Sequence, residues 1–84
     1  MRIEQRGCVE IISMAKPNPV KSGFHCVVEM PTQSNFANLV GLSRETVSRV
    51  LSRLRSDGLV GISSNGLDIL DRKGLENRAF GQSF

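Results

Sequence analysis

Residues 32–57 read TQSNFANLVGLSRETVSRVLSRLRSD, and this stretch decides the fold. Thr32 and Ser43 each stand where a helix N-cap is expected, because a hydroxyl oxygen can accept a hydrogen bond from a free backbone N–H of the first turn. Apolar residues follow each cap at spacings of three and four. This periodicity predicts a short amphipathic helix over 33–40 and a second helix over 44–57.

The connections on either side of the second helix complete the pattern. Gly41 separates the two helices, and a residue that tolerates positive φ suits a sharp turn. Two helices joined by such a turn are typical of a helix-turn-helix. Farther on, Asn65-Gly66 lies between two apolar runs and predicts a β-hairpin, because both residues tolerate positive φ. A hairpin in this position is a wing, so we expect a helix-turn-helix at about 32–57 and a wing at about 59–71.

The remaining elements lie outside this stretch. Apolar spacing predicts a helix over 2–15, which the two following prolines should end in a turn. The β-branched run at 25–30 predicts a strand, and Asp71 is the expected N-cap of a last helix over roughly 72–80. The 84 residues therefore form one domain over 1–84. Its fold class is α+β: a small winged helix-turn-helix with three to four helices and a short β-hairpin wing.

The charge of the chain is concentrated on the second helix of the motif. The formal net charge is +3 at pH 7, and the one local excess consists of Arg44, Arg49, Arg53 and Arg55. Such a stripe is typical of a polyanion-binding surface, although a solvated helix face gives the same pattern.

Three polar side chains lie in the first two turns of this helix, opposite its apolar stripe. Arg44 and Arg49 can each hold the O6 and N7 atoms of guanine, and Glu45 can accept from the N4 amine of cytosine. Recognition helices read bases through their N-terminal residues. Arg53 lies nearer the buried flank, which favours a structural or phosphate-facing role, and Arg55 lies far from the end that would enter the groove.

The sequence contains few residues that could perform catalysis or bind a metal ion. The chain has one histidine and two cysteines, and no nucleophile–base pair or metal-ligand cluster is evident. Cys8 falls on an apolar helix face and Cys26 in a strand, so we expect both to be buried, reduced and inert. The sequence predicts no enzyme, no catalytic residue and no metal site. The absence of a signal peptide and of a long apolar run favours a cytoplasmic location.

The segment 37–51, ANLVGLSRETVSRVL, together with Leu54 and the DGLV of 57–60, resembles the C-terminal DNA-binding domain of the Crp/Fnr family of bacterial transcription regulators. The likeness runs from about residue 30 to 75, and 43–49 is its most specific part. It implies sequence-specific binding of double-stranded DNA, with the helix 44–57 in the major groove. The resemblance also implies base reading by Arg44, Glu45 and Arg49, and DNA phosphate contacts by Thr32, Ser43, Thr46, Ser48 and, in the wing, Ser64.

The spacing Arg-Glu-x-x-x-Arg at 44–49 resembles the cyclic-AMP-receptor branch, whose half-sites resemble TGTGA. Gln33 and Ser34 depart from the basic or larger polar pair often found in the family. The family's effector-binding β-barrel and long dimerisation helix do not fit ahead of this domain. We therefore expect no cofactor in this chain and a monomer, whereas a full-length parent would be a homodimer with RNA polymerase as a candidate partner. No membrane partner is expected.

One alternative comes from a different class of function. A winged helix can serve as a protein-interaction module that does not bind DNA. Such a module would replace the residues at 44, 45, 48 and 49 with apolar or acidic ones, and this sequence keeps the DNA-binding pattern there.

Overall fold

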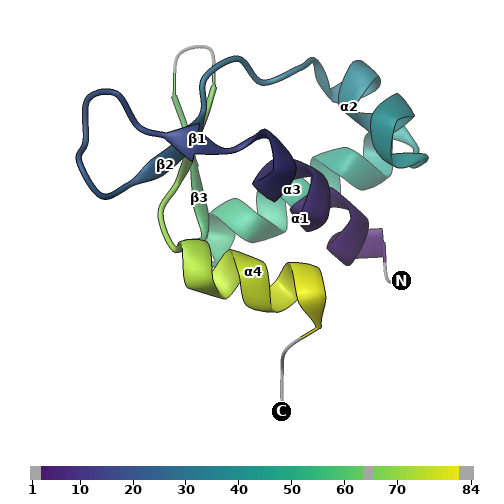
Figure 1. Ribbon diagram of the computed structural model, residues 1–84. Helices are drawn as coiled ribbons and strands as arrows, with labels where there is room; N and C mark the ends of the chain where they lie inside the picture. The colour runs from purple at the N-terminus through teal and green to yellow at the C-terminus, as the bar shows by residue number, and fades with distance from the viewer. Residues whose placement is uncertain (1–2, 64–65, 82–84) are drawn as a thin grey trace.

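The structure is a computed structural model that describes residues 3–63 and 66–81. In this part of the chain, four helices pack beside a small sheet (Figure 1). The helices are α1 (Ile3–Met14), α2 (Gln33–Val40), α3 (Arg44–Ser56) and α4 (Arg72–Phe80). The strands are β1 (Lys16–Pro17), β2 (His25–Val27), β3 (Val60–Ile62) and β4 (Leu67–Ile69). The expected α+β winged helix-turn-helix is confirmed.

The sheet is antiparallel throughout, with the strand order β1-β2-β4-β3. The predicted hairpin forms between β3 and β4, and β2 lies against the other edge of β4. The predicted strand 25–30 is too long: it ends at Val27, which pairs with Leu67 at the start of β4, so no partner residue continues the ladder. Lys16 and Pro17 were expected only to end a helix, yet they pair with Cys26 and His25 as β1.

The core joins all four helices to the sheet. Among the described residues, no polar or charged side chain is buried. The largest side chains with less than 2% exposure are those of Ile11, Phe36, Val47, Leu54, Val60, Leu67 and Leu75. Helix α1 contributes Cys8 and Ile11 and packs mainly against α4, with further contacts to α2 and α3. Burial of these apolar side chains is the main favourable term in folding, at about 25 cal/mol per Å² of apolar surface.

The predicted helix starts are confirmed by their hydrogen bonds. The hydroxyl oxygen of Thr32 accepts from the backbone N–H of Asn35 at 3.1 Å, and that of Ser43 accepts from Thr46 at 3.2 Å. The carboxylate of Asp71 caps α4 in the same way. Gly41 ends α2 in the left-handed region with φ 71°, as a tight turn between two helices requires.

The backbone φ of Gly66 is defined in part by Asn65, which lies outside the described residues, so the type of turn stays a prediction. The structure shows that Gly66 is required for a close approach to the end of β2. A Cβ at this position would overlap the carbonyl oxygen of Val27 and would lie 2.7 Å from that of Val28.

This geometry predicts a stability difference between two glycines of the same hairpin. Gly66→Ala should lower the free energy of unfolding by about 2–4 kcal/mol, because backbone atoms must move to admit the methyl group. Gly61→Ala is the matched control: its Cβ would meet only the side chain of Leu70, at 3.5 Å. Urea unfolding followed by circular dichroism measures both, and an equal effect of the two substitutions would contradict this account.

Candidate nucleic-acid interface

Helix α3 separates an apolar face from a polar one. Val47 and Leu54 are buried in the core, and Val50 and Leu51 are partly buried against it. The side chains on the opposite face are exposed, namely those of Arg44, Glu45, Ser48, Arg49, Ser52 and Arg55. The three residues predicted to read bases therefore lie on one solvent-facing surface, at the N-terminal end of the helix.

A shallow hollow of about 300 Å³ lies at this end of α3. It is lined by Gln33 of α2 together with Arg44, Glu45 and Ser48 of α3. Arg49 is not among the lining residues and lies farther along the helix. Gln33 is a member of the candidate site that sequence reasoning treated only as a departure from the family. No local sequence signal marked Gln33, because only the packing of α2 against α3 brings it beside Arg44.

The predicted phosphate-contacting hydroxyls also build the helix starts. Thr32 and Ser43 each accept a backbone N–H, and the hydroxyls of Ser43 and Thr46 are 2.8 Å apart and hydrogen-bonded to each other. A hydroxyl that accepts a hydrogen bond still has a proton to donate. Thr32 thus keeps its hydroxyl proton to donate. Of the two hydroxyl protons of Ser43 and Thr46, one is used in the hydrogen bond between them and the other is left to donate. These hydroxyl groups lie beside the exposed start of α3, where a phosphate oxygen could accept hydrogen bonds from them.

The wing leads away from the opposite end of α3. The left-handed Gly58 turns the chain into β3, and Figure 1 shows the hairpin of β3 and β4 leaving the C-terminal end of α3, whereas α2 lies at its N-terminal end. Ser64, the predicted phosphate contact of the wing, lies outside the described residues.

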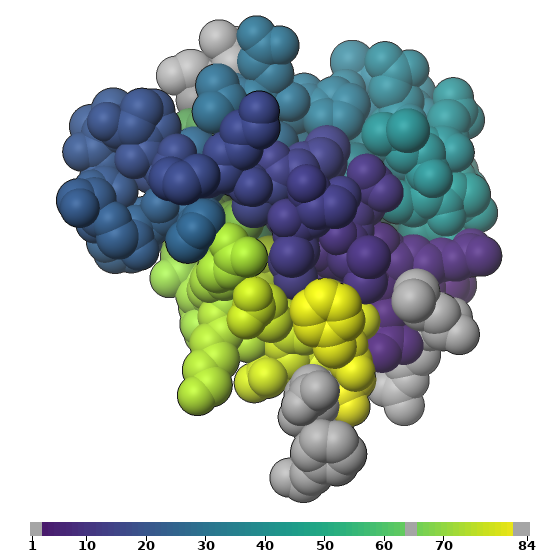
Figure 2. All heavy atoms as spheres, viewed as in Figure 1, coloured from purple at the N-terminus to yellow at the C-terminus, as the bar shows by residue number. Residues whose placement is uncertain are grey.

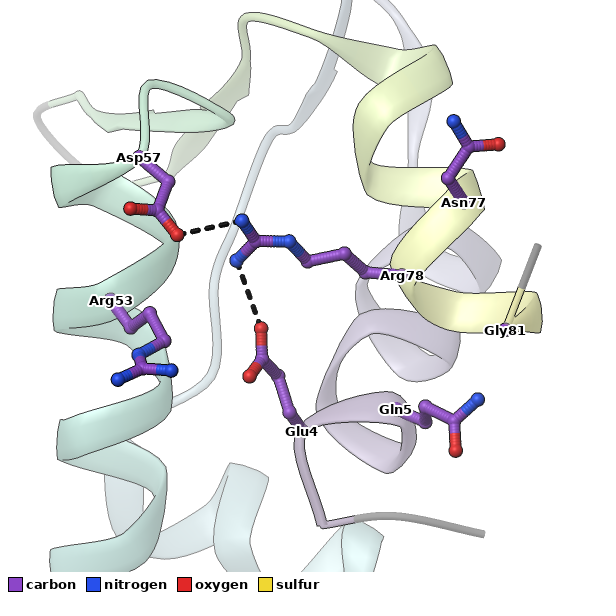
Figure 3. A pocket seen from close by; sticks show the side chains of 7 residues that line it. All are labelled: Glu4, Gln5, Arg53, Asp57, Asn77, Arg78 and Gly81. Carbon is purple, nitrogen blue, oxygen red and sulfur yellow. Dashed lines mark hydrogen bonds and ion pairs between the residues drawn. The ribbon is translucent and has the colours of Figure 1, made fainter. Parts of the chain in front are cut away.

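A second hollow, of about 590 Å³, lies between α1, α3 and α4 (Figure 3). There Arg78 reaches from α4 to two carboxylates, that of Asp57 at the end of α3 at 2.7 Å and that of Glu4 in α1 at 3.0 Å. The hydrogen bond with Asp57 is the main cause that raises the pKa of Arg78, so it stays a cation. This bridge holds the C-terminal end of α3 against the scaffold.

Arg53 lines this second hollow and not the hollow that contains Arg44 and Glu45. In Figure 3 its side chain lies on α3 beside the ion pair of Arg78 with Asp57. The role of Arg53 in DNA binding stays a prediction.

Both cysteines are buried and unpaired. Among residues 3–63 and 66–81, no group of three or more His, Cys, Asp or Glu side chains could hold a metal ion. Burial raises the pKa of the Cys8 thiol from its ordinary value of 9.0 to about 11. Since the thiolate is the reactive form, this shift keeps Cys8 unreactive at neutral pH.

The raised pKa of Cys8 predicts a loss of stability in alkali. The folded state holds this proton more tightly, so its stabilising contribution is present below pH 9 and is lost as the pH rises towards about 11. The free energy of unfolding should fall over this range by about 2 kcal/mol from this group alone. Urea unfolding at successive pH values measures the fall. It should be smaller in Cys8→Ala than in Cys26→Ala, and equal falls would refute the assignment.

Comparison with known proteins places this geometry in a family. The Crp-like helix-turn-helix domain matches residues 5–78, so the chain belongs to that family. The family and the fold define it as a DNA-binding domain of the kind that transcription regulators contain. No curated protein matches the chain significantly.

Two solved structures illustrate the likeness. A transcriptional regulator of the CRP/FNR family from Thermus thermophilus is 25% identical with a TM-score of 0.75, over 94% of this chain and 41% of its own. The reduced, Fe(II) CO-sensing protein from R. rubrum is 28% identical with a TM-score of 0.76, over 92% of this chain and 35% of its own. The chain thus spans less than half the length of these two proteins. No helix in its described part has the length and apolar character needed to cross a bilayer.

Proposed function

We propose that the chain binds double-stranded DNA sequence-specifically, with α3 in the major groove, as the DNA-binding part of a bacterial transcription regulator of the Crp/Fnr type. The observation that supports this proposal is the exposed N-terminal face of α3. It presents Arg44, Glu45 and Arg49 to solvent while the opposite face of the helix is buried in the core. A rigidly backed helix end with exposed hydrogen-bonding side chains is what major-groove reading requires.

The spacing of the two arginines sets what they can reach. Arg44 and Arg49 are five residues apart, which corresponds to about 7.5 Å along a helix axis. They can therefore reach guanines about two base pairs apart. Glu45 lies between them in sequence and can accept from cytosine on the opposite strand. A half-site resembling TGTGA suits this set.

The hydroxyl groups at the helix starts would contact the phosphates of the DNA backbone. Thr32 has a proton left to donate to a phosphate oxygen, and so has one of the pair Ser43 and Thr46, while Ser48 lies exposed beside Arg44 and Glu45. Ser64, outside the described residues, would add a contact from the wing. Phosphate contacts fix the position of a protein on the duplex, and base contacts then provide specificity.

The assembly of the protein is also a proposal. The apolar face of α1 is used within the domain, where Cys8 and Ile11 are fully buried, so it is not free to pair with a second copy. We therefore propose that this chain alone is a monomer. A longer parent, as its neighbours' lengths suggest, would bind as a homodimer and could contact RNA polymerase.

The salt dependence of binding tests the proposal against the protein-interaction alternative. If about four phosphates are neutralised, the logarithm of the association constant should fall with the logarithm of salt concentration at a slope of roughly −3 to −4. Fluorescence anisotropy with a short labelled duplex, at salt concentrations from about 50 to 200 mM, gives this slope. A chain that shows no DNA binding at the lowest salt, or no salt dependence, would leave the protein-interaction module as the better explanation.

The base-reading assignment has its own test. Arg44→Ala and Arg49→Ala should each cost about 1–3 kcal/mol on a TGTGA half-site and should flatten discrimination at one base pair. Arg53→Ala is the matched control, because it removes the same charge from the same helix but from the other hollow. It should lower affinity equally for all sequences or mainly affect folding. Each variant is titrated with a panel of duplexes that differ by single base pairs. Unchanged relative affinities across the panel for Arg44→Ala and Arg49→Ala would refute base reading by these residues.

A further inference from the structure

Helix α1 lies unusually close to the helix-turn-helix at Gly7. A Cβ on Gly7 would lie 3.3 Å from Cγ1 of Val50 in α3 and 4.0 Å from the ring of Phe36 in α2. This approach brings the preceding residue, Arg6, to the turn between α2 and α3. Nη1 of Arg6 lies 3.8 Å from the position that a Cβ on Gly41 would occupy. Figure 2 shows the N-terminal part of α1, in purple, beside the teal surface of α2 and the turn.

No described residue neutralises the charge of Arg6. Its side chain is exposed and makes no hydrogen bond or ion pair within the described residues. Glu4, two residues before it, is bound to Arg78 on the side of α4, at 3.0 Å. Glu10, one turn after it, accepts from the hydroxyl of Ser13. Each neighbouring carboxylate of α1 thus has another partner, and the guanidinium keeps its full capacity to bind an anion.

Arg6 lies at the turn that leads into the proposed DNA-binding surface. The turn at Gly41 leads within two residues to Ser43, whose hydroxyl is a proposed phosphate contact, and then to Arg44 at the start of α3. In Figure 1 the N-terminal end of α1 lies on the same side of the molecule as this turn. An arginine side chain can span several ångströms and donate two parallel hydrogen bonds to a phosphate.

We infer that Arg6 donates to a DNA phosphate next to the one held at Ser43, so that the DNA-binding surface extends from the helix-turn-helix onto α1. This inference rests on the proposed function. Arg6 supplies affinity without sequence preference, because a phosphate contact carries no base information. A purely structural role would be different: the guanidinium near the C-terminal end of α2 would then act only on the helix dipole.

The test compares three variants of the 84-residue chain by fluorescence anisotropy. Arg6→Ala should weaken binding about three- to tenfold on every duplex of a single-base panel and should reduce the salt slope by about 1. Arg6→Lys keeps the charge and should retain most of the slope. Lys73→Ala is the matched control, because it removes an exposed positive charge from α4 and should change the slope little. Thermal unfolding of Arg6→Ala should match that of the unchanged chain, since no hydrogen bond is lost.

The outcomes separate this inference from the proposed function. If the unchanged chain binds DNA with the expected salt slope but Arg6→Ala binds equally well, or no worse than Lys73→Ala, the contact by Arg6 is refuted and the proposed function stands. If Arg6→Ala lowers the unfolding temperature and leaves the salt slope unchanged, the structural role replaces the DNA contact. If the unchanged chain shows no salt-dependent binding, the proposed function fails, and the inference fails with it.

Discussion

The packing of α1 over the helix-turn-helix is the constraint on which the rest of the structure depends. Helix α2 has eight residues, too few to be stable alone, and it forms because Phe36 and Ala37 are buried. The absence of a side chain at Gly7 lets α1 reach both Phe36 and Val50. Helices α2 and α3 therefore both pack against α1. The exposed start of α3 can be presented as a rigid surface only because its other face is fixed in this way.

The polar chemistry of the domain is arranged entirely around this apolar core. No polar or charged side chain is buried in the described part of the chain. Arginines serve two different purposes here: Arg44 and Arg49 are exposed on the face proposed to meet DNA, whereas Arg78 joins α4 to α1 and to the end of α3. The hydroxyls at the helix starts cap the helices through a lone pair, and Thr32 and one of the pair Ser43 and Thr46 still have a proton to donate to a phosphate.

The amino-acid sequence by itself determined the features that depend on neighbouring residues. The caps Thr32, Ser43 and Asp71, the left-handed Gly41 and the helix periodicity are local, since a cap and its N–H are three residues apart. The hairpin could be predicted for the same reason. The candidate site followed from helix geometry, because the side opposite a buried stripe must face solvent. This placed Arg44, Glu45 and Arg49 on the exposed face of α3, where the structure has them.

Only the tertiary structure decided the features that join distant segments. Glu4 and Arg78 are separated by 74 positions and still form an ion pair. The pairing of Lys16 with Cys26, the position of Gln33 beside Arg44 and that of Arg6 over Gly41 likewise depend on how complete elements pack. Gly66 shows the physical reason most clearly. Local turn rules place it in the hairpin turn, whereas only the packing shows that the backbone at the end of β2, far earlier in the chain, leaves no space for a Cβ at this position.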